Sequence, residues 1–227
     1  MPSQGKVFER DFPAGPAVRG FWHEPSKGWK NALVFTHGAG SNCEAPLCVV
    51  IAEEFAAAGI AVLRCDLPYR QKRPKGAPFP AGAAEDREGL QRAVSAVREK
   101  AGGRVFLGGQ SYGGRQATMV AAENDGLADA LLLTSYPLHP PGQPNQLRTA
   151  HFTKLQTPAL FAHGSKDPFG TLEEMRESLV QIPAPTALLE FEGGVHGLVQ
   201  KQDGTAAFKA MAIRVREAFE EFTSSLA

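Results

Sequence analysis

Six short apolar runs recur along the chain and predict the strands of a sheet. Each run is continuous rather than alternating, which is typical of strands that are covered on both faces. The runs span residues 31–37, 61–65, 104–108, 130–135, 158–163 and 186–191. Two earlier segments, 6–12 and 17–23, have no helical pattern between them, and we expect them to form an antiparallel hairpin at one edge of the sheet.

Helical patterns fill most of the segments between these runs. In the first of them Leu47, Ile51 and Phe55 recur four residues apart, which places them on one helix face. The predicted helices are 46–59, 84–100, 115–124, 171–182 and a last helix that contains 208–222. Alternating strands and helices predict an α/β fold, a mainly parallel central sheet flanked by helices on both faces. We expect a single domain over residues 1–227, without a separate lid domain, because no large insertion separates the predicted strands.

Composition narrows the class of protein further. The 24 Lys and Arg residues balance the 24 Asp and Glu residues, so no overall charge indicates a nucleic acid or a membrane as partner. Cys43, Cys48 and Cys65 form neither a disulfide framework nor a zinc motif, and no cofactor or metal is expected. The first residues lack the apolar core of a secretory signal, and no apolar stretch reaches the roughly 18 residues that span a bilayer. These features predict a cytoplasmic protein, and they leave its oligomeric state open.

The segment 109-GQSYG-113 carries the first chemical signal. It fits the pattern G-x-S-x-G and lies between a predicted strand and a predicted helix, which is the setting of a nucleophile elbow. In such a turn the serine adopts a strained backbone conformation, and the flanking glycines avoid collisions that side chains would cause. The simpler interpretation is a glycine-rich turn that carries an exposed serine. We predict that Ser111 is a nucleophile.

A serine hydroxyl needs a base to remove its proton and a carboxylate to orient that base. Asp167 follows the next-to-last predicted strand and His196 follows the last one, so both lie at the sheet edge where Ser111 lies. Taken alone, Asp167 would be interpreted as an N-cap or turn residue before the helix that follows it. His196 taken alone is compatible with a surface loop. His163 is a rival base, and Asp66 is the first alternative acid. Together the positions predict a Ser111–His196–Asp167 triad.

Two backbone N–H groups are expected to bind the oxyanion that attack on a carbonyl creates. One is that of Tyr112, directly after the nucleophile and at a helix N-terminus. The other is that of Ala39, in the segment 36-THGAGSN-42. In the same segment His37 is interpreted as a residue that organises the loop. His139 and His151 are possible lining residues of the site.

Four short segments carry a resemblance to a known family. The sequences 37-HGAG-40, 109-GQSYG-113, 163-HGSKD-167 and 193-GGVHG-197 resemble the α/β-hydrolase superfamily, over about residues 31 to 227. Within it the chain looks like the small, capless, dienelactone-hydrolase-like group. Dienelactone hydrolases proper use a cysteine nucleophile where this chain has Ser111, so their substrate is not carried over. A related domain that serves as a subunit of a chromatin-associated assembly implies a non-catalytic alternative.

The expected activity is that of a serine hydrolase, which cleaves small carboxylic esters, thioesters or lactones through an acyl-enzyme. A hydrolase-like binding module and a peptidase or acyltransferase with the same triad are the alternatives. Two long, proline-rich loops, 66–83 and 136–158, follow predicted strands and are either walls of the site or inert surface. In the first, Arg70 suits a carboxylate and indicates an anionic substrate. The alternative is a basic loop that faces solvent.

Overall fold

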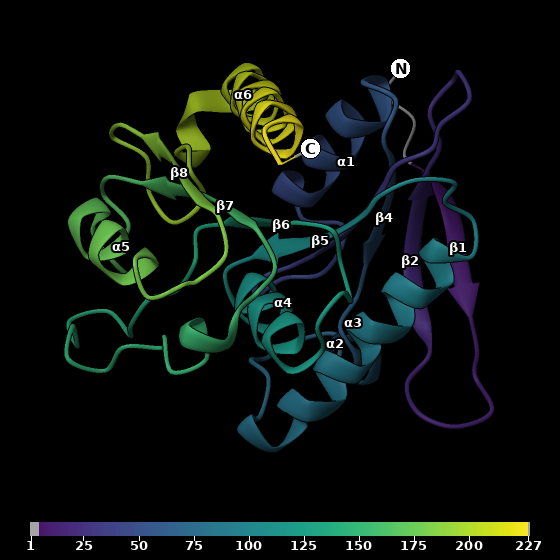
Figure 1. The fold of residues 1–227 in the computed structure, drawn as a ribbon, viewed down its shortest axis with the longest axis horizontal. Helices are drawn as coiled ribbons and strands as arrows, with labels where there is room; N and C mark the ends of the chain where they lie inside the picture. The colour runs from purple at the N-terminus through teal and green to yellow at the C-terminus, as the bar shows by residue number, and fades with distance from the viewer. Residues whose placement is uncertain (1–4, 227) are drawn as a thin grey trace.

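The computed structural model describes residues 5–226 of the chain. Its centre is an eight-stranded sheet with the order β1-β2-β4-β3-β5-β6-β7-β8 (Figure 1). The strands are β1 (Lys6–Arg10), β2 (Val18–His23), β3 (Ala32–Thr36), β4 (Ala61–Cys65), β5 (Val105–Gln110), β6 (Leu131–Thr134), β7 (Ala159–Gly164) and β8 (Thr186–Phe191). Strands β3 to β8 are parallel to one another. At one edge, β1 pairs antiparallel with β2, and β2 pairs antiparallel with β4.

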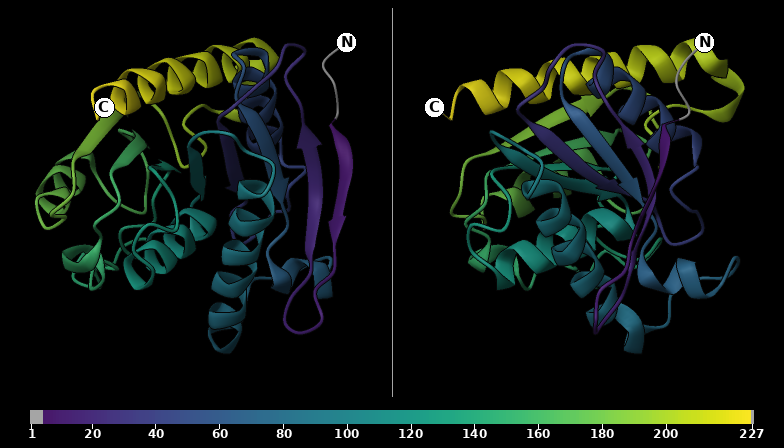
Figure 2. Two further views of the ribbon diagram at one scale, coloured as in Figure 1. Left: turned by 45° about the vertical axis from the view of Figure 1, so that its right-hand side comes forward. Right: turned by 90° about the vertical axis from the view of Figure 1, so that its right-hand side faces the viewer.

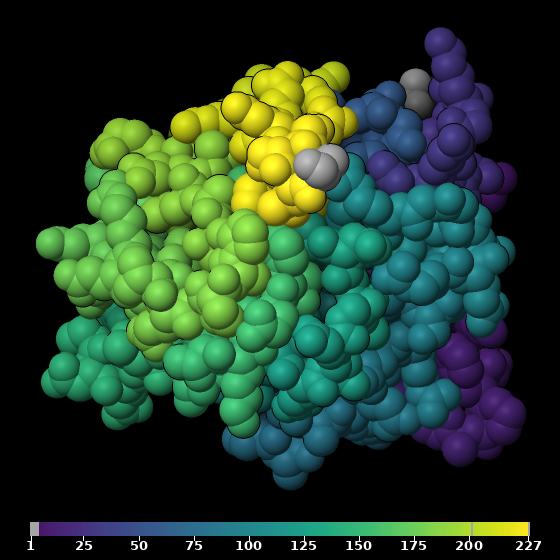
Figure 3. Space-filling model, in the orientation of Figure 1, coloured from purple at the N-terminus to yellow at the C-terminus, as the bar shows by residue number. Residues whose placement is uncertain are grey.

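Helices cover both faces of the sheet (Figure 2). The helices are α1 (Pro46–Ala57), α2 (Pro68–Lys72), α3 (Ala83–Arg98), α4 (Tyr112–Glu123), α5 (Leu172–Leu179) and α6 (Gly204–Ser224). Helices α1 and α6 pack side by side on one face, whereas α3, α4 and α5 pack on the other. In the space-filling view α6, in yellow, lies at the surface between the blue region of α1 and the green region of the last strands (Figure 3). Three short 3₁₀ segments are η1 (Pro80–Gly82), η2 (Phe152–Lys154) and η3 (Lys201–Asp203).

The two helical layers explain why the strand sequences are continuously apolar. Successive side chains of a strand point to opposite faces of the sheet. In β3, Leu33 and Phe35 pack with α1 and α6, whereas Ala32 and Val34 pack with the layer of α3. All five residues of β3 are buried, because neither face of the strand contacts solvent.

The fold predicted from the sequence is confirmed, including the edge hairpin and the helices on both faces. Within residues 5–226 no group of elements forms a separate lid domain. Helix α2 was not predicted, since it lies inside the segment 66–83 that was expected to be a loop. Pro68 favours the first turn of this helix, and Arg73 is extended because Pro74 follows it. No helix in the described part of the chain is long and apolar enough to cross a membrane.

Candidate active site

Ser111 lies in a strained turn between β5 and α4. Its backbone angles are φ 51° and ψ −115°, a region that residues other than glycine rarely adopt. Its N–H donates to Thr134 O at 2.9 Å, and its carbonyl accepts from Arg115 N at 2.9 Å. Both bonds lock the turn, which is how a conformation that costs about 1–3 kcal/mol persists.

The neighbouring glycines are required by close backbone contacts. A Cβ atom on Gly113 would lie 2.5 Å from His37 O, and one on Gly109 would lie 2.8 Å from Gly113 C. These distances are shorter than any real Cβ contact, and the atoms involved belong to the backbone, which cannot rotate away. The glycines of the predicted elbow therefore allow β5, α4 and the loop after β3 to approach one another.

Replacing Gly113 by alanine is expected to lower the free energy of unfolding by about 1–3 kcal/mol, because the new methyl group forces the turn apart. Denaturant unfolding measures this change. Gly102→Ala is the matched control, since a Cβ atom there meets nothing within 4 Å. Equal stability of the two variants would show that the turn around Ser111 is relaxed.

The structure brings Ser111, His196 and Asp167 together. His196 Nε2 lies 2.9 Å from Ser111 Oγ, and His196 Nδ1 lies 2.8 Å from Asp167 Oδ2 and 3.0 Å from Oδ1. An ionised carboxylate only accepts hydrogen bonds, so the proton of the neutral imidazole lies on Nδ1 and Nε2 is free to accept from the serine hydroxyl. The three side chains are arranged for transfer of a proton from Ser111 to His196.

Contacts around Asp167 and His196 hold both in place. The Asp167 side chain is fully buried, and its Oδ1 accepts the Phe169 N–H at 2.9 Å. The ring of Phe169 lies against the imidazole of His196, with centroids 4.2 Å apart. The N-cap of α5 is Thr171, which forms a capping box with Glu174. Asp167 is therefore not the cap of that helix.

The rival residues have other partners. Nε2 of buried His163 bonds to Gly170 O at 2.8 Å, and burial lowers the pKa of its imidazole. Asp66 Oδ1 accepts the Cys43 N–H at 2.7 Å.

His139 and His151 lie beside Glu174 and Thr118, respectively, and neither lines the cavity beside His196 described below. Among five histidines, only His196 forms a hydrogen bond with Ser111. The other four are His37, His139, His151 and His163.

The two predicted oxyanion donors belong to the residue after Ser111 and to the loop after β3, which approaches Ser111. Tyr112 is the first residue of α4, and Ala39 follows Gly38, where a Cβ atom would lie 3.5 Å from Ser111 Cβ. Within residues 5–226 neither the Tyr112 N–H nor the Ala39 N–H has a hydrogen-bond acceptor. Both donors remain available to a bound group. We call residues 37–41 the oxyanion loop.

His37 and Arg70 both bind the oxyanion loop. His37 Nδ1 bonds to Gly38 O at 2.9 Å, as expected of a residue that organises the loop. Arg70 is buried, and four of its five N–H donors bind the carbonyls of Ser41, Ala39, Gly76 and Arg73. The guanidinium of Arg70 is therefore engaged by backbone carbonyls, and its contact with a substrate carboxylate stays a prediction. A solvent-exposed Arg70 is excluded, because the side chain is buried and α2 turns it toward the oxyanion loop.

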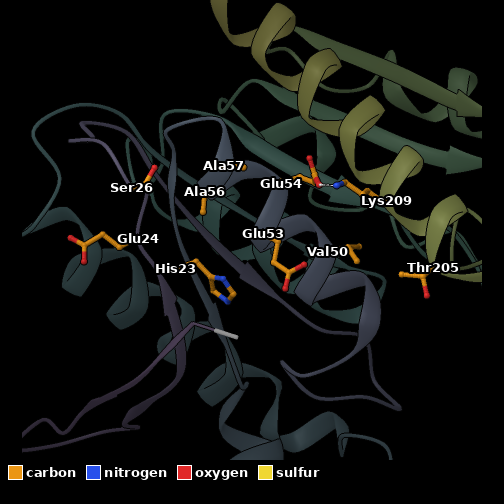
Figure 4. Close-up of a pocket in the computed structure, with 10 residues that line it drawn as sticks. All are labelled: His23, Glu24, Ser26, Val50, Glu53, Glu54, Ala56, Ala57, Thr205 and Lys209. Carbon is orange, nitrogen blue, oxygen red and sulfur yellow. Dashed lines mark ion pairs between the residues drawn. The ribbon is translucent and has the colours of Figure 1, made fainter. Parts of the chain in front are cut away.

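An open cavity of about 1180 Å³ lies beside His196. Leu47, Val49 and Val50 of α1 and Phe208 of α6 give it an apolar wall, and the oxyanion loop reaches it through Gly40 and Ser41. A second hollow, of about 390 Å³, lies between β2, α1 and α6 and is lined by His23, Glu53 and Glu54 among others (Figure 4). Of Ser111, Asp167 and His196, only His196 lines the first cavity, and none of the three lines the second hollow. The cavity beside His196 is the candidate substrate site.

Comparisons with known proteins agree with this architecture. The family model described as alpha/beta hydrolase domain matches residues 29–224. Est1E from Butyrivibrio proteoclasticus has a similar structure, with a TM-score of 0.74 and 15% identity over 97% of this chain and 100% of its own. A dienelactone hydrolase from Anabaena variabilis has a TM-score of 0.72 and 21% identity over 95% of this chain and 98% of its own.

A serine hydrolase without a lid, from Xanthomonas campestris, is a third similar structure. Its TM-score is 0.67, with 14% identity over 96% of both chains. These identities are low, so the three structures establish a shared fold. The match of the family model over residues 29–224 goes further, and it shows that the chain belongs to the alpha/beta hydrolase domain family.

Proposed function

We propose that this protein is a serine hydrolase that cleaves small carboxylic esters through an acyl-enzyme. The observation that carries the proposal is the continuous hydrogen-bonded chain from Asp167 through His196 to Ser111, at a strained turn beside an open cavity. Membership of a hydrolase family supports it. The strained backbone at Ser111 and the hydrogen bond from its hydroxyl to His196 favour catalysis over a binding module, because binding alone requires neither feature.

Acylation begins when Ser111 Oγ forms a bond to the ester carbonyl carbon and its proton passes to His196 Nε2. Asp167 stabilises the imidazolium that results. The carbonyl oxygen becomes an oxyanion, which accepts hydrogen bonds from the N–H groups of Ala39 and Tyr112. The C–O bond to the alcohol then breaks, and His196 protonates the leaving oxygen.

Deacylation repeats these steps with water as the nucleophile. His196 takes a proton from the water as its oxygen bonds to the acyl carbon, and the same two N–H groups bind the second oxyanion. The bond to Ser111 Oγ then breaks, His196 returns the proton to the serine, and the carboxylic acid leaves. Thioesters and lactones pass through the same intermediates and belong to the same proposal.

The cavity indicates which part of a substrate the protein recognises. Its wall of α1 and α6 side chains favours an apolar acyl or alcohol group of modest size. The Arg70 guanidinium binds backbone carbonyls, and among the described lining residues Lys166 is the one Lys or Arg side chain that could attract an anionic ester. The three cysteines are free and buried, which is compatible with the reducing cytoplasm that we propose as the setting.

A panel of chromogenic esters tests the proposed activity. The panel pairs neutral and carboxylate-bearing acyl groups over a range of lengths, and it is assayed with the purified protein. We expect turnover of neutral esters with short or medium acyl groups. Absence of turnover across the whole panel by folded protein would contradict the esterase assignment.

We expect kcat/KM to rise with pH, with the slope of a single proton. Protonated His196 has no lone pair at Nε2 and cannot accept the serine proton, so activity appears as His196 deprotonates. Burial lowers the pKa of His37 and of His163, so both lose their protons at a lower pH than an ordinary histidine does. Initial rates with an ester whose chemistry is rate-limiting measure the profile. A flat profile would contradict a histidine base.

A further inference from the structure

We infer that helix α2 orients the two oxyanion donors, with Tyr69 and Arg70 as the positioning residues. This inference rests on the proposed function, because it concerns the same oxyanion. Hydrogen bonds run from α2 and from its neighbours to the carbonyls on either side of the Ala39 N–H, and a buried carboxylate joins α2 to Tyr112.

The first contact fixes the peptide unit that carries the Ala39 N–H. This N–H and the carbonyl of Gly38 belong to one planar unit, so holding the oxygen sets the direction of the N–H. Gly38 O accepts from His37 Nδ1 at 2.9 Å, and the Tyr69 hydroxyl lies 3.3 Å away. Leu67 N–H donates to His37 Nε2 at 3.2 Å, so the ring proton must lie on Nδ1. The residue just before α2 therefore selects the tautomer that holds Gly38 O.

The next contacts hold the other side of Ala39. Its carbonyl accepts from the Tyr69 hydroxyl at 2.8 Å and from Arg70 Nη2 at 3.2 Å. Arg70 Nε donates to Ser41 O at 2.7 Å. The guanidinium is planar and is itself anchored on Arg73 O and Gly76 O, so it holds two carbonyls of the oxyanion loop at a fixed spacing.

The second donor is connected to the same helix. The buried carboxylate of Asp86, on α3, accepts the Tyr69 N–H at 3.0 Å and the Tyr112 hydroxyl at 2.8 Å. The rings of Tyr69 and Tyr112 meet edge to face, with centroids 5.9 Å apart. Tyr69 thus contacts the loop that carries one donor and the side chain of the residue that carries the other.

These contacts have a catalytic consequence, because oxyanion donors act only when they already point at the charge that develops. Loss of one whole donor typically lowers kcat by about 10²–10³-fold. Loosening a donor that is still present should cost less, and we expect about a tenfold loss. Hydrogen bonds to the Gly38 carbonyl also polarise its peptide unit, which makes the Ala39 N–H a stronger donor.

Tyr69→Phe tests the inference, since it removes only the hydroxyl. Tyr136→Phe is the matched control, because Tyr136 is also buried and also donates to a backbone carbonyl, that of Arg148, at 2.9 Å. The rate constant for labelling of Ser111 by a fluorophosphonate is measured for both variants. In that reaction Ser111 Oγ bonds to phosphorus as its proton passes to His196 Nε2, and fluoride leaves. The developing negative charge is placed on an oxygen that the same N–H groups bind.

We expect Tyr69→Phe to label about tenfold more slowly than the wild type, and Tyr136→Phe to label at the wild-type rate. With an ester substrate, kcat of Tyr69→Phe should fall by the same factor while KM and the pH profile stay unchanged, because substrate binding and His196 are not affected. A trifluoromethyl ketone, which forms a tetrahedral adduct with an oxyanion, should bind more weakly by the same factor. A merely structural role would change stability without this matched loss.

Labelling of Tyr69→Phe at the wild-type rate, or an equal loss in Tyr136→Phe, would overturn the inference and leave the proposed function intact. Absence of labelling in the wild type would overturn both. If Tyr69→Phe does not fold, Arg70→Lys replaces it, since lysine keeps the charge but cannot hold the Ser41 and Ala39 carbonyls together. Its labelling rate is expected to fall by about tenfold as well, and a wild-type rate would again overturn the inference.

Discussion

Replacing Ser111 or His196 by alanine is expected to lower kcat by about 10⁴-fold or more. Ser111 supplies the atom that bonds to the substrate, and His196 takes the serine proton across the 2.9 Å contact. Either loss disables the whole unit, so the double variant should be little worse than each single one. Steady-state rates with the best ester of the panel measure the effect.

The control for this prediction is Ser95→Ala, a change of the same chemistry at an exposed position of α3. Its activity should equal that of the wild type. Turnover by folded Ser111→Ala at a rate near that of the wild type would show that a different group attacks the substrate.

Replacing Asp167 by asparagine is expected to lower kcat by about 10³–10⁴-fold, somewhat less than loss of the nucleophile. The amide oxygen of the new side chain should keep the bond to the Phe169 N–H, which places the NH₂ group where Oδ2 now meets His196 Nδ1. That NH₂ group donates to Nδ1, so the ring proton moves to Nε2 and faces Ser111. A histidine in this tautomer cannot accept the serine proton.

Asp129→Asn is the control for Asp167→Asn. Asp129 also accepts a backbone N–H, that of Val105 at 2.7 Å, but at the amino end of β5, opposite the candidate site. It should change stability without changing kcat. Full activity of Asp167→Asn would mean that another carboxylate supports His196, and Asp66 would be the first to test.

The layered fold could be predicted because buried positions carry apolar residues, and these form recognisable runs in the sequence. A strand such as β3 has helices on both faces, so every position is apolar, and the run is visible without knowledge of its neighbours. The grouping of Ser111, Asp167 and His196 was predictable for a related reason. Parallel strands place their carboxyl ends at one edge, so residues in the segments that follow β5, β7 and β8 meet there.

The supports of the oxyanion loop could not be predicted in the same way. Helix α2 has five residues, too few for an apolar period to appear. The partners of Arg70 are backbone carbonyls, which every residue has and which no sequence pattern reveals. The surrounding cluster of basic residues favoured an exposed loop instead, because such clusters usually face solvent. The contact of Asp86 with Tyr112 joins α3 to α4 and depends on how these helices pack. The proline before Tyr69 and the following basic residues were the only visible signals.

The residues of the cavity wall could not be predicted from the sequence either. It combines residues of α1 with Phe208 of α6, which are far apart in the chain and meet only because the two helices pack side by side. Each of these side chains fits the apolar face of its own helix equally well. Only the tertiary structure separates the positions that face the cavity from those that face the core.

The proposed mechanism requires Ser111 to be a nucleophile that His196 activates. Treatment of the folded protein with a fluorophosphonate, followed by intact-protein mass measurement and peptide mapping, tests this requirement. We expect one label per chain, on the peptide that contains Ser111, with none in Ser111→Ala and a greatly slowed reaction in His196→Ala. Absence of a label in folded wild-type protein, or a label on another residue, would contradict the mechanism.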